Sequence, residues 1–161
     1  MRITAEEWQS LRLIREIGRT ERTDEFTEQL VRVWEASVRA SHHFLTGEDI
    51  RRLSPWVAPA LKETETLLVS FQADVPVGFM GIQDRKIEML FLAPSCIGKG
   101  LGKQLVHLAV NRYKVAYVDV NEQNPHAAGF YRHLGFETFR RDENGRSRQS
   151  VPHTADEIEQ P

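Results

Sequence analysis

The sequence predicts a single α/β domain, because strand patterns and helix patterns alternate along most of its 161 residues. The clearest unit is residues 87–105, which begin with the apolar run Ile-Glu-Met-Leu-Phe-Leu, typical of a strand buried on both faces. Pro94 ends the strand because it has no N–H to donate. Gly98, Gly100 and Gly102 follow at alternate positions, and apolar residues then recur with helical spacing. This unit therefore predicts a strand, a glycine loop and a helix.

Two helices and a hairpin are expected before this unit. The expected elements are an extension at 1–10, a strand at 11–17, a helix capped by Thr23 or Asp24 that runs to about Ser41, a helix from Thr46, and paired strands at 67–71 and 77–82. Thr46 and Asp49 have the spacing of a capping box, which marks the start of the second helix. Pro55 and Pro59 are expected to break or kink that helix.

After the glycine loop the sequence predicts a strand, a short helix and another strand. The ranges are 116–120 for the alternating strand, 127–134 for the helix that Gly135 ends, and a strand that begins at 136–139. The last residues, 142–161, are polar, with Val151 and Ile158 as their large aliphatic side chains. We expect them to form a weakly ordered tail.

Composition and charge indicate a soluble globular protein and exclude several partners. Hydrophobic residues make up 40% and charged residues 27% of the chain, and the formal net charge is −2. A chain so close to neutral has no overall field that would recruit nucleic acid or an anionic membrane. Cys96 is the only cysteine, which excludes an internal disulfide and fits a reducing compartment. Residues 1–10 lack the apolar core of a signal peptide, and no apolar run approaches the ~20 residues of a membrane helix. We therefore expect a cytoplasmic protein without nucleic-acid or membrane partners.

The glycine loop is suited to binding phosphate, because glycine exposes backbone N–H groups at the positive end of the following helix dipole. A P-loop would need Ser or Thr after Gly102-Lys103, where Gln104 stands. The dinucleotide fingerprint would need glycine at Lys103 or at Leu105. Both nucleotide interpretations fail on spacing.

Two motifs in order resemble a different family, the GNAT acyl-CoA N-acyltransferases. The three alternate glycines after Pro94 are similar to the pyrophosphate loop of that family, and residues 124–136 resemble its Asn-x-x-Ala-x-x-Phe-Tyr-x-x-x-Gly-Phe motif. The resemblance covers residues 11–141. It implies a mixed central sheet of six to seven strands, splayed between the fourth and fifth and flanked by about four helices. That family usually closes with an apolar seventh strand, which the polar residues 142–161 suggest is absent or altered here.

The resemblance also implies acetyl-CoA as co-substrate and a set of residues that bind it. The loop amides would hold the pyrophosphate, and the backbone of Leu90, Phe91 and Leu92 would pair with pantetheine. Ile97 stands where the family has Gln or Arg, so one polar contact is expected to be missing. The implied cofactor contacts are Leu90, Phe91, Leu92, Ile97, Gly98, Lys99, Gly100, Leu101, Gly102, Lys103, Asn121, Asn124, Ala127 and Phe130.

Tyr131 is the candidate proton donor to the leaving thiolate, since a phenol with a pKa near ~10 is protonated at neutral pH. A core aromatic is the alternative interpretation of Tyr131, and a plain helix cap is the alternative for Asn124. Glu88 is the candidate general base if the apolar residues around it bury its side chain, because burial would raise the pKa of its carboxyl. The alternative interpretation is a charged side chain on the solvent-exposed face of the strand. His42 and His43 are the other candidates for the base.

The acceptor is expected to bind in a variable loop after the first helix. His42, His43 and Phe44 lie in that loop, and Trp34 and Trp56 are further candidates, although packing explains Phe44, Trp34 and Trp56 better than a role in the pocket does. The remaining histidines lack partner ligands at metal spacing, so no metal is expected.

The sequence therefore predicts an N-acetyltransferase that acts by direct attack of a primary amine in a ternary complex. The acceptor is expected to be a small molecule or a protein. The sequence does not decide between a monomer and a homodimer. The alternative is a CoA-binding or interaction module without turnover, for which Ile97 and the altered tail are the motivation.

Overall fold

The computed structural model describes residues 12–121, 124–141 and 146–150, which form a seven-stranded sheet with four α-helices. The strands are β1 Arg12–Glu16, β2 Thr66–Gln72, β3 Val75–Gln83, β4 Lys86–Leu92, β5 Tyr117–Asn121, β6 Glu137–Arg141 and β7 Arg146–Ser150. The helices are α2 Asp24–Ser41, α3 Gly47–Glu63, α4 Leu101–Tyr113 and α5 Pro125–His133, with short 3-10 turns η1 Arg19–Glu21 and η2 Pro94–Cys96.

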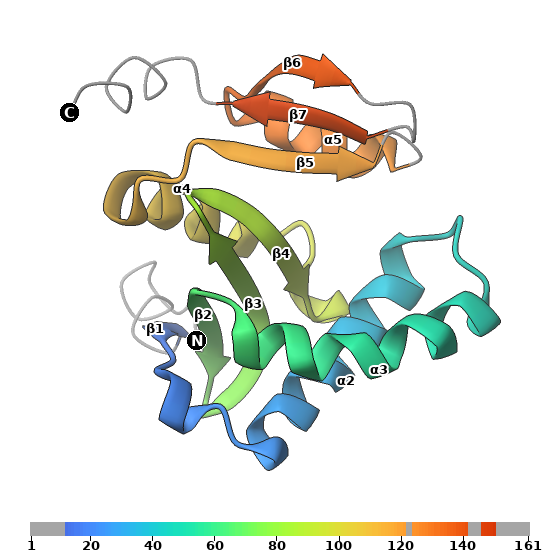
Figure 1. The fold of residues 1–161 in the computed structure, drawn as a ribbon, viewed down its shortest axis with the longest axis vertical. Coiled ribbons are helices and arrows are strands. Elements are labelled where there is room, and N and C mark those ends of the chain that lie inside the picture. Colours follow the sequence, from blue (N-terminus) through green and yellow to red (C-terminus); the bar gives the residue numbers. More distant parts are fainter. Residues whose placement is uncertain (1–11, 122–123, 142–145, 151–161) are drawn as a thin grey trace, which may run out of the picture.

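The sheet is mixed and splayed at its centre, as the sequence predicts. Its order is β1-β2-β3-β4-β5-β7-β6, and every neighbouring pair is antiparallel except β4 and β5. The parallel register of β4 with β5 covers Lys86 with Tyr117 and Ile87 with Val118, and the two strands then diverge (Figure 1). The remaining edge of β4 is therefore free of β5 and available to another partner.

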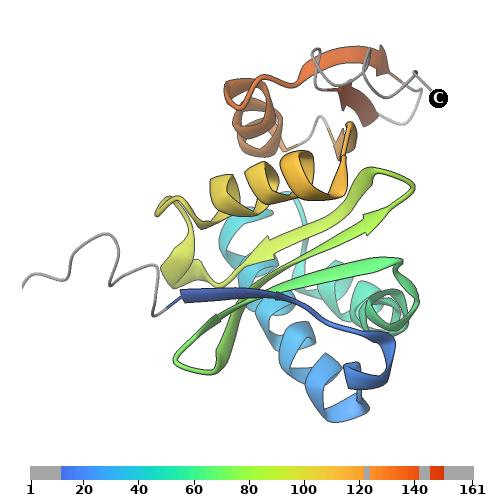
Figure 2. The same cartoon turned by 90° about the vertical axis from the view of Figure 1, so that its left-hand side faces the viewer.

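Helices cover both faces of the sheet and enclose two apolar cores. Figure 2 shows α4 on one face of strands β2 to β4 and α2 with α3 on the other. The core under α4 and α5 includes Leu101, Leu105 and Phe136, whereas the core under α2 and α3 includes Leu30 and Leu61. The two cores fix the ends of α2, α4 and α5 around the point where β4 and β5 diverge.

The two N-terminal helices begin where their caps predict. The Thr23 hydroxyl accepts a hydrogen bond from the Phe26 N–H at 3.2 Å, and Thr46 forms a reciprocal capping box with Asp49. The expected break at Pro55 and Pro59 is wrong, because α3 runs through both. The two prolines are four residues apart and exposed, so they share the face opposite the buried side chains of α3.

Of the two alternatives for the last strand, absent or altered, the structure shows a strand with an altered, polar sequence. Strand β7 lies between β5 and β6 and pairs with both, while 142–145 and 151–161 lie outside the described residues. Its sequence is polar, yet Ser147 and Gln149 are buried on one face and Arg148 lies on the other. Main-chain pairing on both sides holds the strand, and this does not require apolar side chains.

Strand β4 is less buried than its apolar sequence predicts. Ile87 is buried, Glu88 is exposed, and the following side chains to Leu92 are half-buried. The expectation of burial on both faces is wrong because β5 leaves β4 after Ile87. No described helix is long and apolar enough to cross a membrane.

Candidate active site

Two of the three loop glycines adopt a backbone conformation that favours glycine. Gly98 has φ 77° and Gly100 has φ 86°, and Gly100 is the N-cap of α4. A Cβ built on either residue meets no atom within 4 Å, so the space in front of the loop is open. The amides at this helix start can therefore receive an anion.

Gly102 has a different role, because the structure packs against it. A Cβ on Gly102 would lie 3.2 Å from Cζ of Phe130 and 3.5 Å from Cδ1 of Leu92. The lack of a side chain thus lets the first turn of α4 contact the Phe130 ring of α5. Glycine therefore keeps the loop open at Gly98 and Gly100, whereas at Gly102 it permits close packing.

A cavity of about 560 Å³ opens in front of this loop, between α4, α5 and the end of α2. The predicted cofactor residues that line it are Leu90, Leu92, Ile97, Gly98, Gly100, Gly102, Lys103, Asn124, Ala127 and Phe130. Ser37, Ser41, Pro125, His126, Gly129 and His133 also line it and were not predicted. No sequence motif marked Ser37 and Ser41, because only the tertiary fold brings α2 to this cavity. His126 and His133 could have been found from their positions on the predicted helix.

Three predicted cofactor residues are placed elsewhere. Leu101 is fully buried in the core, and Lys99 is exposed and is not among the described lining residues. Phe91 lines a second cavity instead. Asn121 ends β5, and its side chain lies outside the described part of the chain.

The open edge of β4 faces the larger cavity. The Ala93 N–H donates to the Val77 carbonyl of β3, whereas the Leu92 N–H donates to Oγ of Ser37 at 3.3 Å, away from β3. Since successive amides of a strand point to opposite sides, the Leu90 N–H has the same direction as that of Leu92. This edge offers main-chain groups to an extended ligand, with the Leu92 amide already held by α2.

A second cavity, of about 170 Å³, lies where β4 and β5 diverge. Its lining includes Phe44, Phe91, Glu88 and Asp119. Five residues line both cavities, namely His42, Leu90, Asn124, Ala127 and Tyr131. The two cavities therefore meet at a small group of polar side chains.

Tyr131 occupies this junction from α5. Its ring is 6% exposed and makes edge contacts with Phe130 and Phe136, with centroids 5.0 Å and 5.5 Å away. Burial raises the pKa of the Tyr131 phenol well above its ordinary value. The phenol is thus neutral at physiological pH.

His42 reaches the junction from the end of α2 and is hydrogen-bonded at both ring nitrogens. Its Nδ1 lies 2.8 Å from Oγ of Ser41, and its Nε2 lies 3.3 Å from Nδ2 of Asn124. Asn124 caps α5, and its Oδ1 accepts from the Ala127 N–H at 3.1 Å. Burial, together with the nearby His43, lowers the pKa of the His42 imidazole.

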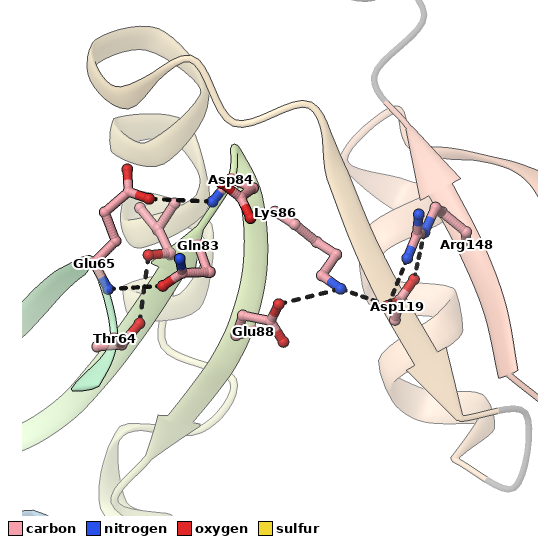
Figure 3. A network of polar contacts seen from close by, with 9 residues as sticks. Thr64, Glu65, Gln83, Asp84, Lys86, Glu88, Asp119 and Arg148 are labelled. Carbon is pink, nitrogen blue, oxygen red and sulfur yellow. Dashed lines mark hydrogen bonds and ion pairs between the residues drawn. The ribbon is translucent and has the colours of Figure 1, made fainter. Parts of the chain in front are cut away.

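Glu88 is not buried, which removes the reason given for a base at this position. Its side chain is 41% exposed, and Oε1 lies 3.1 Å from Nζ of Lys86 (Figure 3). The same Nζ donates to Asp119 at 3.0 Å, and Arg148 of β7 donates to Asp119 at 2.8 and 3.1 Å. The Arg148 hydrogen bonds, and after them Lys86, lower the pKa of Asp119 to about 2. A chain of alternating charges thus crosses β4, β5 and β7 beside the smaller cavity.

The predicted acceptor residues divide into two groups. His42 and Phe44 line the smaller cavity, whereas Trp34 is 6% exposed in the core and contacts the Phe91 ring. Trp34 therefore lies in the core, the alternative position that the sequence left open for it. His43 and Trp56 are exposed and are not among the described residues of either cavity. Within the described ranges, no three His, Cys, Asp or Glu side chains are grouped as a metal site requires.

Comparison with known proteins agrees with the glycine loop and the splayed sheet. The family model of the acetyltransferase (GNAT) domain matches residues 23–155. The chain belongs to the GNAT acetyltransferase family. Members of this family use acetyl-CoA as acetyl donor, and the match extends past residue 141 to include β7.

Curated relatives of this GNAT protein include peptidyl-lysine N-acetyltransferases. The YjaB proteins of Salmonella typhimurium and Escherichia coli are 36% and 37% identical to it over 116 residues. These alignments cover 72% of this chain and 80% and 79% of the two relatives. The similarity therefore spans most of each protein.

Solved structures of GNAT proteins share the fold. The apo solution structure of Escherichia coli YjaB has a TM-score of 0.72 and 32% identity, and the match covers 88% of this chain and 97% of that one. PaiA N-acetyltransferase of Thermoplasma acidophilum, solved in complex with coenzyme A, has a TM-score of 0.68 at 20% identity, over 87% of this chain and 98% of that one.

Proposed function

We propose that this protein transfers the acetyl group of acetyl-CoA to the side-chain amine of a lysine in a peptide or protein, with both substrates bound together. The observation that carries the proposal is the junction of two cavities at His42, Asn124 and Tyr131. One cavity leads from the glycine loop and the other from the gap between β4 and β5. Each substrate thus has its own entrance, and the reacting groups meet at polar side chains.

The larger cavity fits acetyl-CoA. The open amides of the loop and the start of α4 suit its pyrophosphate, and Lys103 adds a positive charge there. The edge of β4 at Leu90 offers a main-chain N–H to the pantetheine amides. Ile97 lines the cavity with an apolar side chain, so binding relies on the backbone at this point. When bound, acetyl-CoA supplies an acetyl group on a thioester, whose leaving group is a thiolate.

The smaller cavity suits a lysine side chain. The rings of Phe44 and Phe91 can cover the aliphatic stem, and carboxylates lie beside them to attract the amine. Asp119 is paired with both Lys86 and Arg148, whereas Glu88 shares only Lys86 and is the more exposed of the two, so Glu88 is the carboxylate that an incoming cation would meet first. The naming of the YjaB relatives as peptidyl-lysine acetyltransferases supports this acceptor class.

Tyr131 supplies the proton that the thiolate needs. Its hydroxyl carries a proton at neutral pH, and the residue lines both cavities at their junction. A donor at this point stabilises negative charge as it develops on sulfur.

The test is an acetyl-transfer assay with lysine-containing peptides and small amines as acceptors. We expect thiol release that depends on the peptide, with acetyl-lysine detected by mass spectrometry. Release with small amines alone would contradict the peptidyl acceptor. Binding of acetyl-CoA without any acceptor-dependent release would contradict the proposed transfer and favour a binding module.

A further inference from the structure

We propose that His42 is the proton acceptor for the attacking amine, and that Asn124 and Ser41 hold its ring in the tautomer that leaves the lone pair on Nε2. The inference rests on the proposed acetyl transfer and adds a residue to it. The carrying observation is a chain of hydrogen bonds that runs through the cavity junction, from the cap of α5 to the last turn of α2.

The donors and acceptors in this series of hydrogen bonds can be assigned from its α5 end. The Ala127 backbone N–H can only donate, so the Asn124 side-chain oxygen accepts and the amide nitrogen of Asn124 points to His42. An amide nitrogen donates, and therefore Nε2 of His42 must accept. The orientation of the Asn124 side chain is thus set by the backbone of α5.

The other end of the chain requires the same tautomer. The Ser41 hydroxyl lies 2.7 Å from the Ser37 carbonyl, which can only accept, so Ser41 donates its proton there. The Ser41 oxygen must then accept from Nδ1–H of His42. Both ends agree on a neutral ring with the proton on Nδ1 and a lone pair on Nε2.

The lone pair lies at the place where the amine has to lose a proton. His42 and Asn124 each line both cavities, and the bond between them is long, at 3.3 Å, so an amine can replace it. The titratable or charged groups around the ring are His43 beside it, Tyr131, His126 and His133 on α5, Glu88 on β4, Asp119 on β5 and Lys103 on α4. Glu88 and Asp119 are each paired with Lys86, so the ring does not depend on them for its charge.

The proton balance is simple. The lysine ammonium first releases one proton to solvent, so the attacking amine is neutral. As the nitrogen–carbon bond forms and the carbon–sulfur bond breaks, this amine gives one proton to Nε2 of His42, and Tyr131 gives one to sulfur. The His42 imidazolium then returns a proton through solvent to the Tyr131 phenolate. The products are the amide and the free thiol, and both side chains regain their starting protonation.

Nitrogen NMR of the protein alone tests the tautomer without any turnover. We expect the His42 ring to be protonated on Nδ1 when neutral, with a pKa below the ordinary value for histidine. A neutral ring protonated on Nε2 would overturn the hydrogen-bond chain and the proposal with it.

Kinetics tests the role. His42→Gln should lower kcat by about 10²-fold or more and remove the acidic limb of the pH–rate profile, with acetyl-CoA affinity unchanged. His42→Ala should recover part of its rate with added imidazole, which a purely structural role would not allow. His107→Gln is the matched control on the outside of α4 and should behave as wild type.

Asn124→Asp gives a second test that keeps the helix cap. Aspartate caps a helix as well as asparagine does, but its carboxylate accepts where the amide donated. It should therefore favour the His42 imidazolium and move the acidic limb to higher pH. An active wild type whose His42→Gln variant keeps its rate and acidic limb would refute the role of His42 alone, whereas an inactive wild type would refute the proposed transfer.

Discussion

Replacing Asp119 with asparagine tests the charge network that joins the two halves of the sheet. Asp119 of β5 accepts two hydrogen bonds from Arg148 of β7 and one from Lys86 of β4, beside a β4–β5 register of only two described residue pairs (Figure 3). Lowering its pKa from 3.8 to about 2 corresponds to roughly 2 kcal/mol, since one pH unit is worth about 1.4 kcal/mol. The side chain is 28% exposed, so we expect Asp119→Asn to cost about 1–2 kcal/mol at pH 7.

The pH dependence distinguishes lost charge from lost packing. A carboxyl whose folded pKa is depressed stabilises above its unfolded pKa, and this stability is lost as the pH falls through the folded value. Urea unfolding should therefore give a constant difference between wild type and variant from pH 7 to pH 5. The difference should shrink from pH 4 toward pH 2. Asp74→Asn, in the exposed turn between β2 and β3, is the control and should change stability by less than about 0.5 kcal/mol. An equal difference at pH 3 and pH 7 would refute the electrostatic explanation.

Variants at three further positions test the site. Tyr131→Phe keeps the buried ring and should lower kcat about 10²-fold with little change in acetyl-CoA affinity; a well-folded variant with full kcat would leave Tyr131 as packing only. Glu88→Gln should raise KM for a lysine peptide and leave the acidic limb of the pH–rate profile in place, and a shifted limb would return the base to Glu88. Gly100→Glu should abolish CoA binding in calorimetry, whereas Gly100→Ala strains the same backbone without charge and should weaken binding less; equal losses would contradict the anion site.

Features that depend on neighbouring residues could be predicted from the sequence. The glycine loop, the caps at Thr23 and Thr46 and the Asn124 cap all rest on contacts within three or four residues. Such contacts are encoded by residue type and spacing, and tertiary packing rarely overrides them. The strand–loop–helix unit and the GNAT motif could be predicted for the same reason.

Burial was predicted less well, because it depends on which strand lies alongside. The apolar residues of β4 read as a buried strand, but β5 leaves β4 after Ile87 and Glu88 faces solvent. The polar sequence of β7 predicted a weakly ordered tail, but the strand pairs with β5 and β6 and places Arg148 in hydrogen-bonding distance of Asp119. The sequence left Trp34 with two alternatives, pocket or core, and α2 places it in the core.

The sequence alone therefore determined the family, and it proposed the glycine loop as a phosphate site and Tyr131 as a proton donor, since each lies in a continuous motif. Only the tertiary structure distinguished His42 from His43, which are adjacent in the chain. The partner that orients His42 is Asn124, 82 residues away, and the two meet because β4 and β5 diverge and let α2 and α5 approach each other. A hydrogen bond between such distant residues leaves no periodicity or spacing in the sequence, and so only the folded chain reveals it.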